Sequence, residues 1–146
     1  MKFTIDEALD YSSHGFLQEW VHGFLETEGR NPHLARIMKD KGYWLGIFEF
    51  PLSNLVRCCG PEENMKFHED PKKWDETVTK MTDKLKSGWR APPLIVWHLN
   101  GVLSVADGNH RFEAMKRNNY KKYWIIIWFE ELKDFENFKI LNKINI

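Results

Sequence analysis

The segment "VADGNHRFEAM", from Val105 to Met115, gathers side chains that could act on a phosphate group. A carboxylate, a glycine, an amide, an imidazole and a guanidinium follow one another from Asp107 to Arg111. An arginine can form two parallel hydrogen bonds with phosphate oxygens. A histidine can donate a hydrogen bond or carry a proton, and an aspartate can hold Mg²⁺ or accept a hydroxyl proton. These residue types are suited to binding a phosphate group.

This segment lies where a strand is expected to pass into a helix. A short apolar run precedes it, and Phe112 and Met115 share one face of the helix that follows. The first N–H groups of a helix have no partner inside the helix, and the helix dipole makes that end positive. Gly108 would let a ligand come close to the backbone there. The alternative is that the same polar residues only cap the helix and are otherwise solvated.

The first forty residues predict helices. Thr4 and Glu7 have the spacing of a capping box, and apolar residues then repeat at helical intervals as far as residue 25. Asn31-Pro32 is typical of a helix start, and Gly42 is placed to end that short helix. We therefore expect a helical N-terminal extension over residues 1–42.

The remainder, residues 43–146, predicts a mixture of strands and helices. Asn100-Gly101 separates two apolar runs and suits a tight hairpin turn, so these runs are expected to pair antiparallel. Strands are expected at 43–50, 92–99, 102–106 and 123–129, a turn at 51–55, and helices at 72–87, 109–117 and 131–141. The fold class is therefore α+β, with the extension and the domain forming one compact unit.

Composition narrows the classes of function. The 146 residues are enough for one domain, and 21 Lys and Arg balance 21 Asp and Glu, so no overall positive charge favours nucleic acid or a membrane surface. The longest apolar run, Tyr123–Phe129, is too short to span a bilayer, and the N-terminus lacks a signal peptide. We expect a cytoplasmic protein in which the adjacent Cys58 and Cys59 are reduced thiols.

A basic cluster near the expected end of the helix at 109–117 is the best candidate for contact with nucleic acid. Cations complement the dipole at such an end, so most clusters of this kind are simply solvated. The cluster consists of Lys116, Arg117, Lys121 and Lys122.

The order of residues in "DGNHRFEAM" resembles the signature turn of the ParB/sulfiredoxin superfamily. Its members carry Asp-Gly-His-His-Arg or Gly-Gly-Cys-His-Arg, followed by an alanine-containing helix. The expected elements, from the strand before the "PLSNL" step to the strand at 123–129, also follow the order found in that superfamily. The resemblance covers roughly two-thirds of the chain. It implies a small mixed sheet flanked by helices, and it leaves the N-terminal extension outside.

Members of this superfamily bind nucleotides at the turn and then differ in chemistry. Sulfiredoxins use ATP and a catalytic cysteine, kinase-like members use ADP and acidic residues, and ParB proteins bind CTP and clamp DNA. Asn109 stands where sulfiredoxins have their cysteine, so reduction of a sulfinic acid is not expected. The double arginine of ParB and its helix-turn-helix domain have no counterpart in the sequence, so clamping of a centromere is not expected either.

The form that resembles this chain most is Asp-Gly-x-His-Arg, found in kinase-like and nuclease-like members. The resemblance makes Asp107 and His110 the catalytic residues, with Asp107 as a ligand of Mg²⁺ that accompanies ATP, ADP or CTP. An acidic base is expected in the loop before the helix at 72–87, where Glu62, Glu63, His68 and Glu69 are all candidates. Phosphate binding is assigned to Gly108, Asn109, His110 and Arg111, with a further contact from Arg57.

The leading hypothesis is a nucleotide-binding protein with magnesium-dependent phosphoryl transfer or nucleotide hydrolysis at Asp107–Arg111. One alternative is a ParB-like nuclease that acts on DNA. Another is a binding module without catalysis, which keeps the turn only to hold a nucleotide or nucleic acid.

Overall fold

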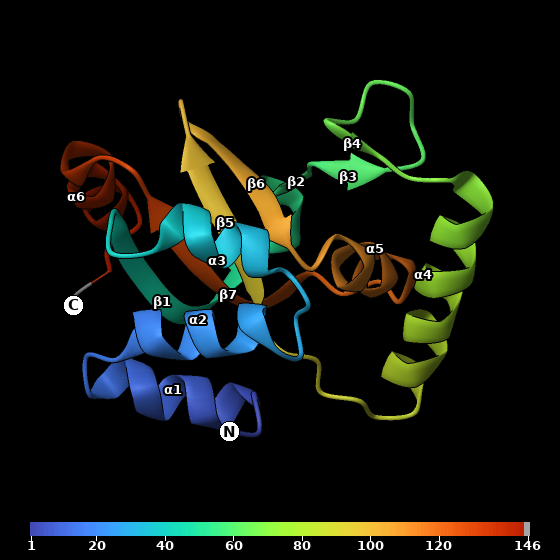
Figure 1. The fold of residues 1–146 in the computed structure, drawn as a ribbon, viewed down its shortest axis with the longest axis horizontal. Coiled ribbons are helices and arrows are strands. Elements are labelled where there is room, and N and C mark those ends of the chain that lie inside the picture. Colours follow the sequence, from blue (N-terminus) through green and yellow to red (C-terminus); the bar gives the residue numbers. More distant parts are fainter. Residues whose placement is uncertain (145–146) are drawn as a thin grey trace.

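The computed structural model describes residues 1–144 and has the expected α+β architecture. Helices cover a mixed sheet, with α3 across one part of it and the α4–α5 pair at one side (Figure 1). The helices are α1 (Ile5–Ser13), α2 (Leu17–Glu26), α3 (Pro32–Met38), α4 (Pro71–Lys86), α5 (Asn109–Arg117) and α6 (Leu132–Leu141).

The main sheet has five strands in the order β1-β7-β5-β6-β2. Its β5 runs parallel to β7, and β2 runs parallel to β6, whereas the β1–β7 and β5–β6 pairs are antiparallel. A second sheet joins β3 to β4, and these short strands were expected to be loop. The strands are β1 (Tyr43–Pro51), β2 (Val56–Arg57), β3 (Cys59–Gly60), β4 (Phe67–His68), β5 (Leu94–Leu99), β6 (Val102–Asp107) and β7 (Lys122–Phe129).

Local signals set several ends of these elements. The N–H of Glu7 donates to Oγ1 of Thr4 at 3.1 Å, which confirms the cap that the sequence predicts for α1. Asn31 caps α3, as expected, by accepting from the N–H of Leu34 at 3.3 Å. The expected hairpin also forms, because Asn100 and Gly101 both take positive φ values, 51° and 77°.

The expected end of α3 at Gly42 is wrong. The helix ends at Met38, and Asp40 with φ of 55° turns the chain before β1 begins. Gly42 lies against Trp128 of β7, where a Cβ would collide with the indole nitrogen. This glycine therefore allows β1 to enter the sheet and has no part in ending the helix.

One hydrophobic core joins the N-terminal helices to the sheet. Trp20 and Phe24 of α2 are fully or almost fully buried and stack with ring centroids 5.4 Å apart. Apolar side chains of β5 and β7 complete the core from the sheet side. The division at residues 42 and 43 remains a prediction. No helix within residues 1–144 is both long and apolar enough to cross a membrane.

Candidate functional site

A cavity of about 570 Å³ lies over the β5–β6 hairpin, at the N-terminal end of α5. The helix α3 forms one wall of it, with His33 and Ile37 among the lining residues. The opposite wall is the segment from β2 to β4, and the hairpin itself supplies Trp97 and Leu99. The predicted segment reaches the cavity through Asp107, Gly108, Asn109 and His110.

Gly108 is the residue that turns strand β6 into helix α5. Its φ of +105° is in the region that favours glycine. A Cβ at this position would lie 2.8 Å from Cδ2 of Leu94 and 2.7 Å from Nη2 of Arg111. Glycine has no side chain to cap the helix, so α5 begins without a side-chain cap at residues that line the cavity, and its first N–H groups give this end a positive potential.

Asp107 is the last residue of β6, and its side chain forms polar contacts inside the protein. The residue is only 8% exposed, although it lines part of the cavity. Oδ1 accepts a hydrogen bond from Nδ2 of Asn31 at 3.0 Å, and Oδ2 lies 3.6 Å from Nη2 of Arg111. Both oxygens of this carboxylate are therefore already engaged by the chain.

Arg111 points into the core, away from the cavity that its neighbours line. Its Nη2 donates to the carbonyl of Pro93 at 3.1 Å, and the guanidinium lies over the ring of Phe24 at 5.5 Å. Burial lowers the pKa of Arg111, and the nearby carboxylate of Asp107 opposes this shift. In the structure the guanidinium therefore stabilises the turn from its buried side.

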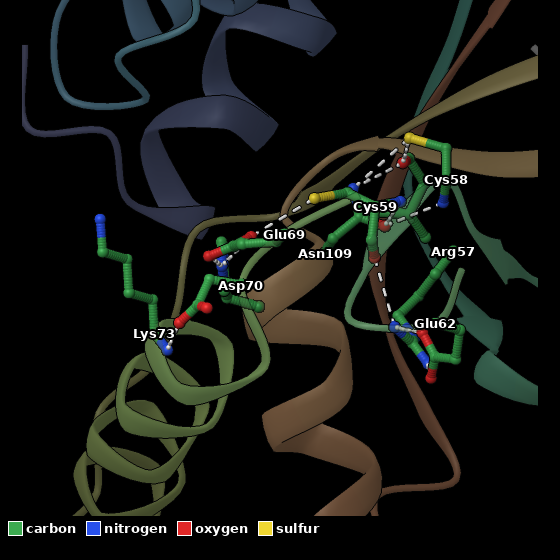
Figure 2. Close-up of polar contacts among 10 residues, drawn as sticks. Arg57, Cys58, Cys59, Glu62, Glu69, Asp70, Lys73 and Asn109 are labelled. Carbon is green, nitrogen blue, oxygen red and sulfur yellow. Dashed lines mark hydrogen bonds and ion pairs between the residues drawn. The ribbon is translucent and has the colours of Figure 1, made fainter. Parts of the chain in front are cut away.

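Asn109 holds the segment around the two cysteines in place. Its Oδ1 accepts from the N–H of Cys58 at 3.1 Å, and its Nδ2 donates to the carbonyl of Val105 at 2.9 Å. Figure 2 shows Asn109 beside Cys58 and Cys59. This amide, 7% exposed as a residue, therefore connects β2 and β3 to the end of β6.

His110 has a carboxylate partner that the sequence left open. Its Nε2 lies 2.9 Å from Oε2 of Glu69, and its ring packs against Trp74 at an interplanar angle of 38°, with centroids 4.7 Å apart. Glu69 directly precedes Asp70, which caps α4 by accepting from the N–H of Lys73 at 3.1 Å. The start of α4 thus positions Glu69 toward α5 (Figure 2).

The other candidates for an acidic base lie elsewhere. Glu62 forms a two-point ion pair with Arg57, at 2.6 and 3.1 Å. Nε2 of His68 is 3.1 Å from the carbonyl of Pro61, and Glu63 is exposed. Of the four candidates, the structure brings Glu69 alone into contact with the predicted segment among the contacts within residues 1–144.

Arg57 is occupied by protein partners. Besides Glu62, its Nε lies 3.5 Å from Oε2 of Glu113, and its guanidinium lies over Trp74 at 5.0 Å. Burial disfavours its charge, but the hydrogen bonds to Glu62 and the charge of Glu113 outweigh burial and raise the pKa of Arg57. Nη1 of Arg57 also donates to the carbonyl of Cys59 at 3.3 Å, so the pair is tied to the segment of the two cysteines that line the cavity (Figure 2).

The two thiols are held in the neutral form. Sγ of Cys58 donates to the carbonyl of Val105 at 3.0 Å, and Sγ of Cys59 donates to Oε2 of Glu69 at 3.4 Å. Burial raises the pKa of Cys58, and burial together with the carboxylate of Glu69 raises the pKa of Cys59 to about 12. These are poor nucleophiles, because the thiolate is the reactive form.

The residues around Asp107 do not fit a magnesium ion held by that carboxylate. Mg²⁺ prefers six oxygen ligands in near-octahedral geometry, usually carboxylates, waters and substrate phosphates. Asp107 is instead paired with Asn31 and Arg111. No group of three His, Cys, Asp or Glu side chains within residues 1–144 is arranged to hold a metal ion.

The basic cluster predicted as a contact for nucleic acid is largely paired with carboxylates. Nζ of Lys116 lies 3.9 Å from Glu113, and Nη2 of Arg117 lies 3.3 Å from Asp75. Lys122 is 3.8 Å from Glu49 across the β1–β7 pair. The pairing reduces the positive charge that this surface offers to a phosphate backbone.

Sequence reasoning missed the residues that α3 and the β-segment contribute to the cavity. Asn31 was recognised only as a cap, and its second hydrogen bond reaches Asp107 across 76 positions. Lys66 and Phe67 fall in a stretch without periodicity, so no pattern pointed to them. The one sequence signal for Trp97 was the pair of apolar runs separated by a hairpin turn, which places this residue on a strand of the hairpin under the cavity.

No model of a known protein family matches the chain, and no curated protein matches it. Among solved structures, the chain is similar to sulfiredoxin from Arabidopsis thaliana, with 19% identity and a TM-score of 0.40 over 66% of this chain and 98% of that one. It is also similar to a Pnob8-like ParB-N domain, with 16% identity and a TM-score of 0.36 over 70% of this chain and 38% of the other.

A third similar structure is the C-terminally truncated chromosome-partitioning protein ParB from Caulobacter crescentus complexed with CTP-gamma-S. Its identity is 21% and its TM-score 0.36, over 70% of this chain and 55% of that one. The chain thus spans well under two-thirds of both ParB chains.

Proposed function

We propose that the cavity binds a nucleoside di- or triphosphate, with its phosphates at the N-terminal end of α5 and with His110 as the general base of a phosphoryl transfer. The observation that carries this proposal is the end of α5 itself. There Gly108, in a left-handed conformation, leaves the first turn open to a cavity of about 570 Å³. Pockets for small ligands are usually about 300–1,000 Å³.

The phosphate end follows from helix electrostatics. The N–H groups at the start of α5 point toward an anion, and the helix dipole adds positive potential at the same place. Lys66 lines the cavity and adds a full positive charge. Asp107 adds little net negative charge, because Arg111 lies 3.6 Å from its carboxylate. Asp107 and Arg111 thus act as positioning residues for the turn.

The chemical step is assigned to the pair of His110 and Glu69. A histidine that a carboxylate orients is suited to take a proton from a hydroxyl group, and the carboxylate stabilises the imidazolium that forms. His110 would remove the proton from water or from an acceptor hydroxyl as its oxygen bonds to the terminal phosphorus. The bond from phosphorus to the leaving oxygen breaks in the same in-line displacement.

The test is a thermal-shift and binding series with ATP, ADP, CTP and GTP, each with and without MgCl₂. A nucleotide at about a hundred times its dissociation constant should add roughly 2.7 kcal/mol of stability. His110→Ala should keep binding within a few-fold and lose phosphate release. His14→Ala, which changes an exposed histidine at the end of α1, is the matched control. No shift with any of the four nucleotides at millimolar concentration would refute the proposal.

A binding module without catalysis is the second candidate, and a specific observation favours it. Asp107, Asn109 and Arg111 all form hydrogen bonds or ion pairs within the protein, so the turn is built mainly to hold its shape. Saturable nucleotide binding with the same phosphate release in His110→Ala as in the parent would select this module. Cleavage of plasmid DNA would instead support the nuclease alternative.

A further inference from the structure

The N-terminal helix α3 is tied directly to the phosphate end of the cavity. The Asn31 side chain forms two bonds at once: its Oδ1 accepts from the N–H of Leu34, which caps α3, and its Nδ2 donates to Asp107. The helix that follows places Ile37 on the cavity wall. A segment outside the region of motif resemblance therefore builds part of this site.

The cavity changes character along its length. Polar residues line it at the start of α5, and the lining also includes large apolar side chains: Ile37 from α3, Phe67 from β4, and Trp97 and Leu99 from β5. Phe67 and Leu99 are 56% and 48% exposed, although both are large and apolar. Apolar groups that remain exposed around a cavity are typical of a binding site for an apolar ligand surface.

We infer that α3 forms one wall of a nucleobase site, in which the base lies between Ile37 and the aromatic side chains of Phe67 and Trp97. This inference rests on the proposed function, since it places the base of the nucleotide whose phosphates lie at α5. A nucleobase is flat and stacks on aromatic faces, so it suits such walls.

A cation lies on the same wall. Nζ of Lys66 lies over the rings of Phe67 and Trp97, at 5.5 and 5.9 Å. A base that stacks on these rings would displace this ammonium, and the flexible lysine side chain can then turn toward the anionic phosphates. The base thus meets the aromatic wall, and the phosphates meet the positive end of α5.

The experiment compares the nucleoside triphosphate that binds best with inorganic tripolyphosphate, which has the phosphates but no base. Isothermal titration should give at least tenfold tighter binding for the nucleotide. Ile37→Asn should remove most of this difference and leave tripolyphosphate binding within about twofold. Ile140→Asn is the matched control, because this isoleucine is on α6 and 73% exposed. It should bind both ligands as the parent does.

Leu99→Asn changes an exposed residue of the hairpin that lines the same cavity. This variant should also reduce the preference for the nucleotide over tripolyphosphate, and it provides the test if Ile37→Asn does not fold. If both variants keep the preference for the nucleotide, the base site is wrong while the phosphate site stands. Equal affinities for nucleotide and tripolyphosphate in the parent would overturn the base site in the same way. If neither ligand binds the parent, the proposed function fails as well.

Discussion

The first turn of α5 has two sides that differ in what their polar groups contact. On the inner side, Asp107, Asn109 and Arg111 are each less than a tenth exposed and bond to other parts of the chain. On the outer side, Gly108 and His110 are partly exposed; all of these residues except Arg111 line the cavity. Five consecutive residues that look alike as candidates are thus divided between structure and ligand contact.

The residues of a polar cluster in a sequence therefore need not all bind a ligand, because some of them hold the structure together. Buried polar groups must find hydrogen-bond partners, because an unpaired one costs about 1–3 kcal/mol. The inner residues have partners within the protein for most of their polar atoms, with Nε of Arg111 as an exception, so replacing these residues should affect folding before binding. The outer residues should show the reverse pattern.

The largest effect is expected for Arg111→Ala, which leaves the buried carboxylate of Asp107 without its cation. Loss of one partner of a buried pair costs about 3–5 kcal/mol, so the free energy of unfolding in urea should fall by about that amount. Arg117→Ala on the same helix removes only an exposed ion pair with Asp75 and should cost less than about 1 kcal/mol. Similar losses in the two variants would contradict the assignment of Arg111 to the inner side.

Asn109→Ala should have the next largest effect. It leaves the N–H of Cys58 without its acceptor, which should cost about 2 kcal/mol, whereas the carbonyl of Val105 keeps the hydrogen bond from Sγ of Cys58. Amide hydrogen exchange at Cys58 should become faster, since its N–H is no longer held. Asn64→Ala in the exposed loop is the control and should change neither quantity. Unchanged exchange at Cys58 would show that Asn109 does not hold this segment.

The thiols beside these residues give a smaller effect, measured as a rate. Because the pKa values of Cys58 and Cys59 are raised, iodoacetamide at pH 8 should alkylate the folded protein at least tenfold more slowly than the urea-unfolded protein, about 1.4 kcal/mol in activation terms. Cys59→Ser leaves one thiol to follow separately. Equal rates in the folded and unfolded protein would count against the neutral, hydrogen-bonded thiols.

The raised pKa of Cys59 also predicts the direction in which the free energy of unfolding changes with pH. The pKa of Cys59 rises from 9.0 to about 12 on folding, so above pH 9 the unfolded chain releases a proton that the folded chain keeps. Stability should therefore be unaffected by this thiol below pH 9 and should fall as the pH rises toward 12. Cys59→Ser should reduce the slope of that decline.

The smallest effect on stability is expected for His110→Ala, on the outer side of the turn. The imidazole is partly exposed, and its removal lets water solvate Glu69, so the free energy of unfolding should change by less than about 1 kcal/mol. Phosphate release should be lost in this variant and equally in Glu69→Gln, and the double variant should be no worse than either. A loss of stability close to that of Arg111→Ala would place His110 on the inner side.

The sequence predicted those features that depend on residues close together in the chain. The cap at Thr4, the turn at Asn100-Gly101 and the amphipathic face of α4 follow from spacings of one to four residues, and the structure confirms each. The α+β class and the strand-to-helix turn at Gly108 were also predicted, because local periodicity changes there. The very short strands β2 to β4 escaped prediction, since two residues carry no period.

The direction in which each polar side chain of the site points was decided only by tertiary packing. Asn31 meets Asp107 across 76 positions, and His110 meets Glu69 across 41. Residue type shows that a carboxylate or an imidazole can accept a proton, but its partner depends on which elements pack beside it. The sequence therefore determined the turn and its residue types, whereas the packing of α3 and α4 decided which partners its polar side chains contact.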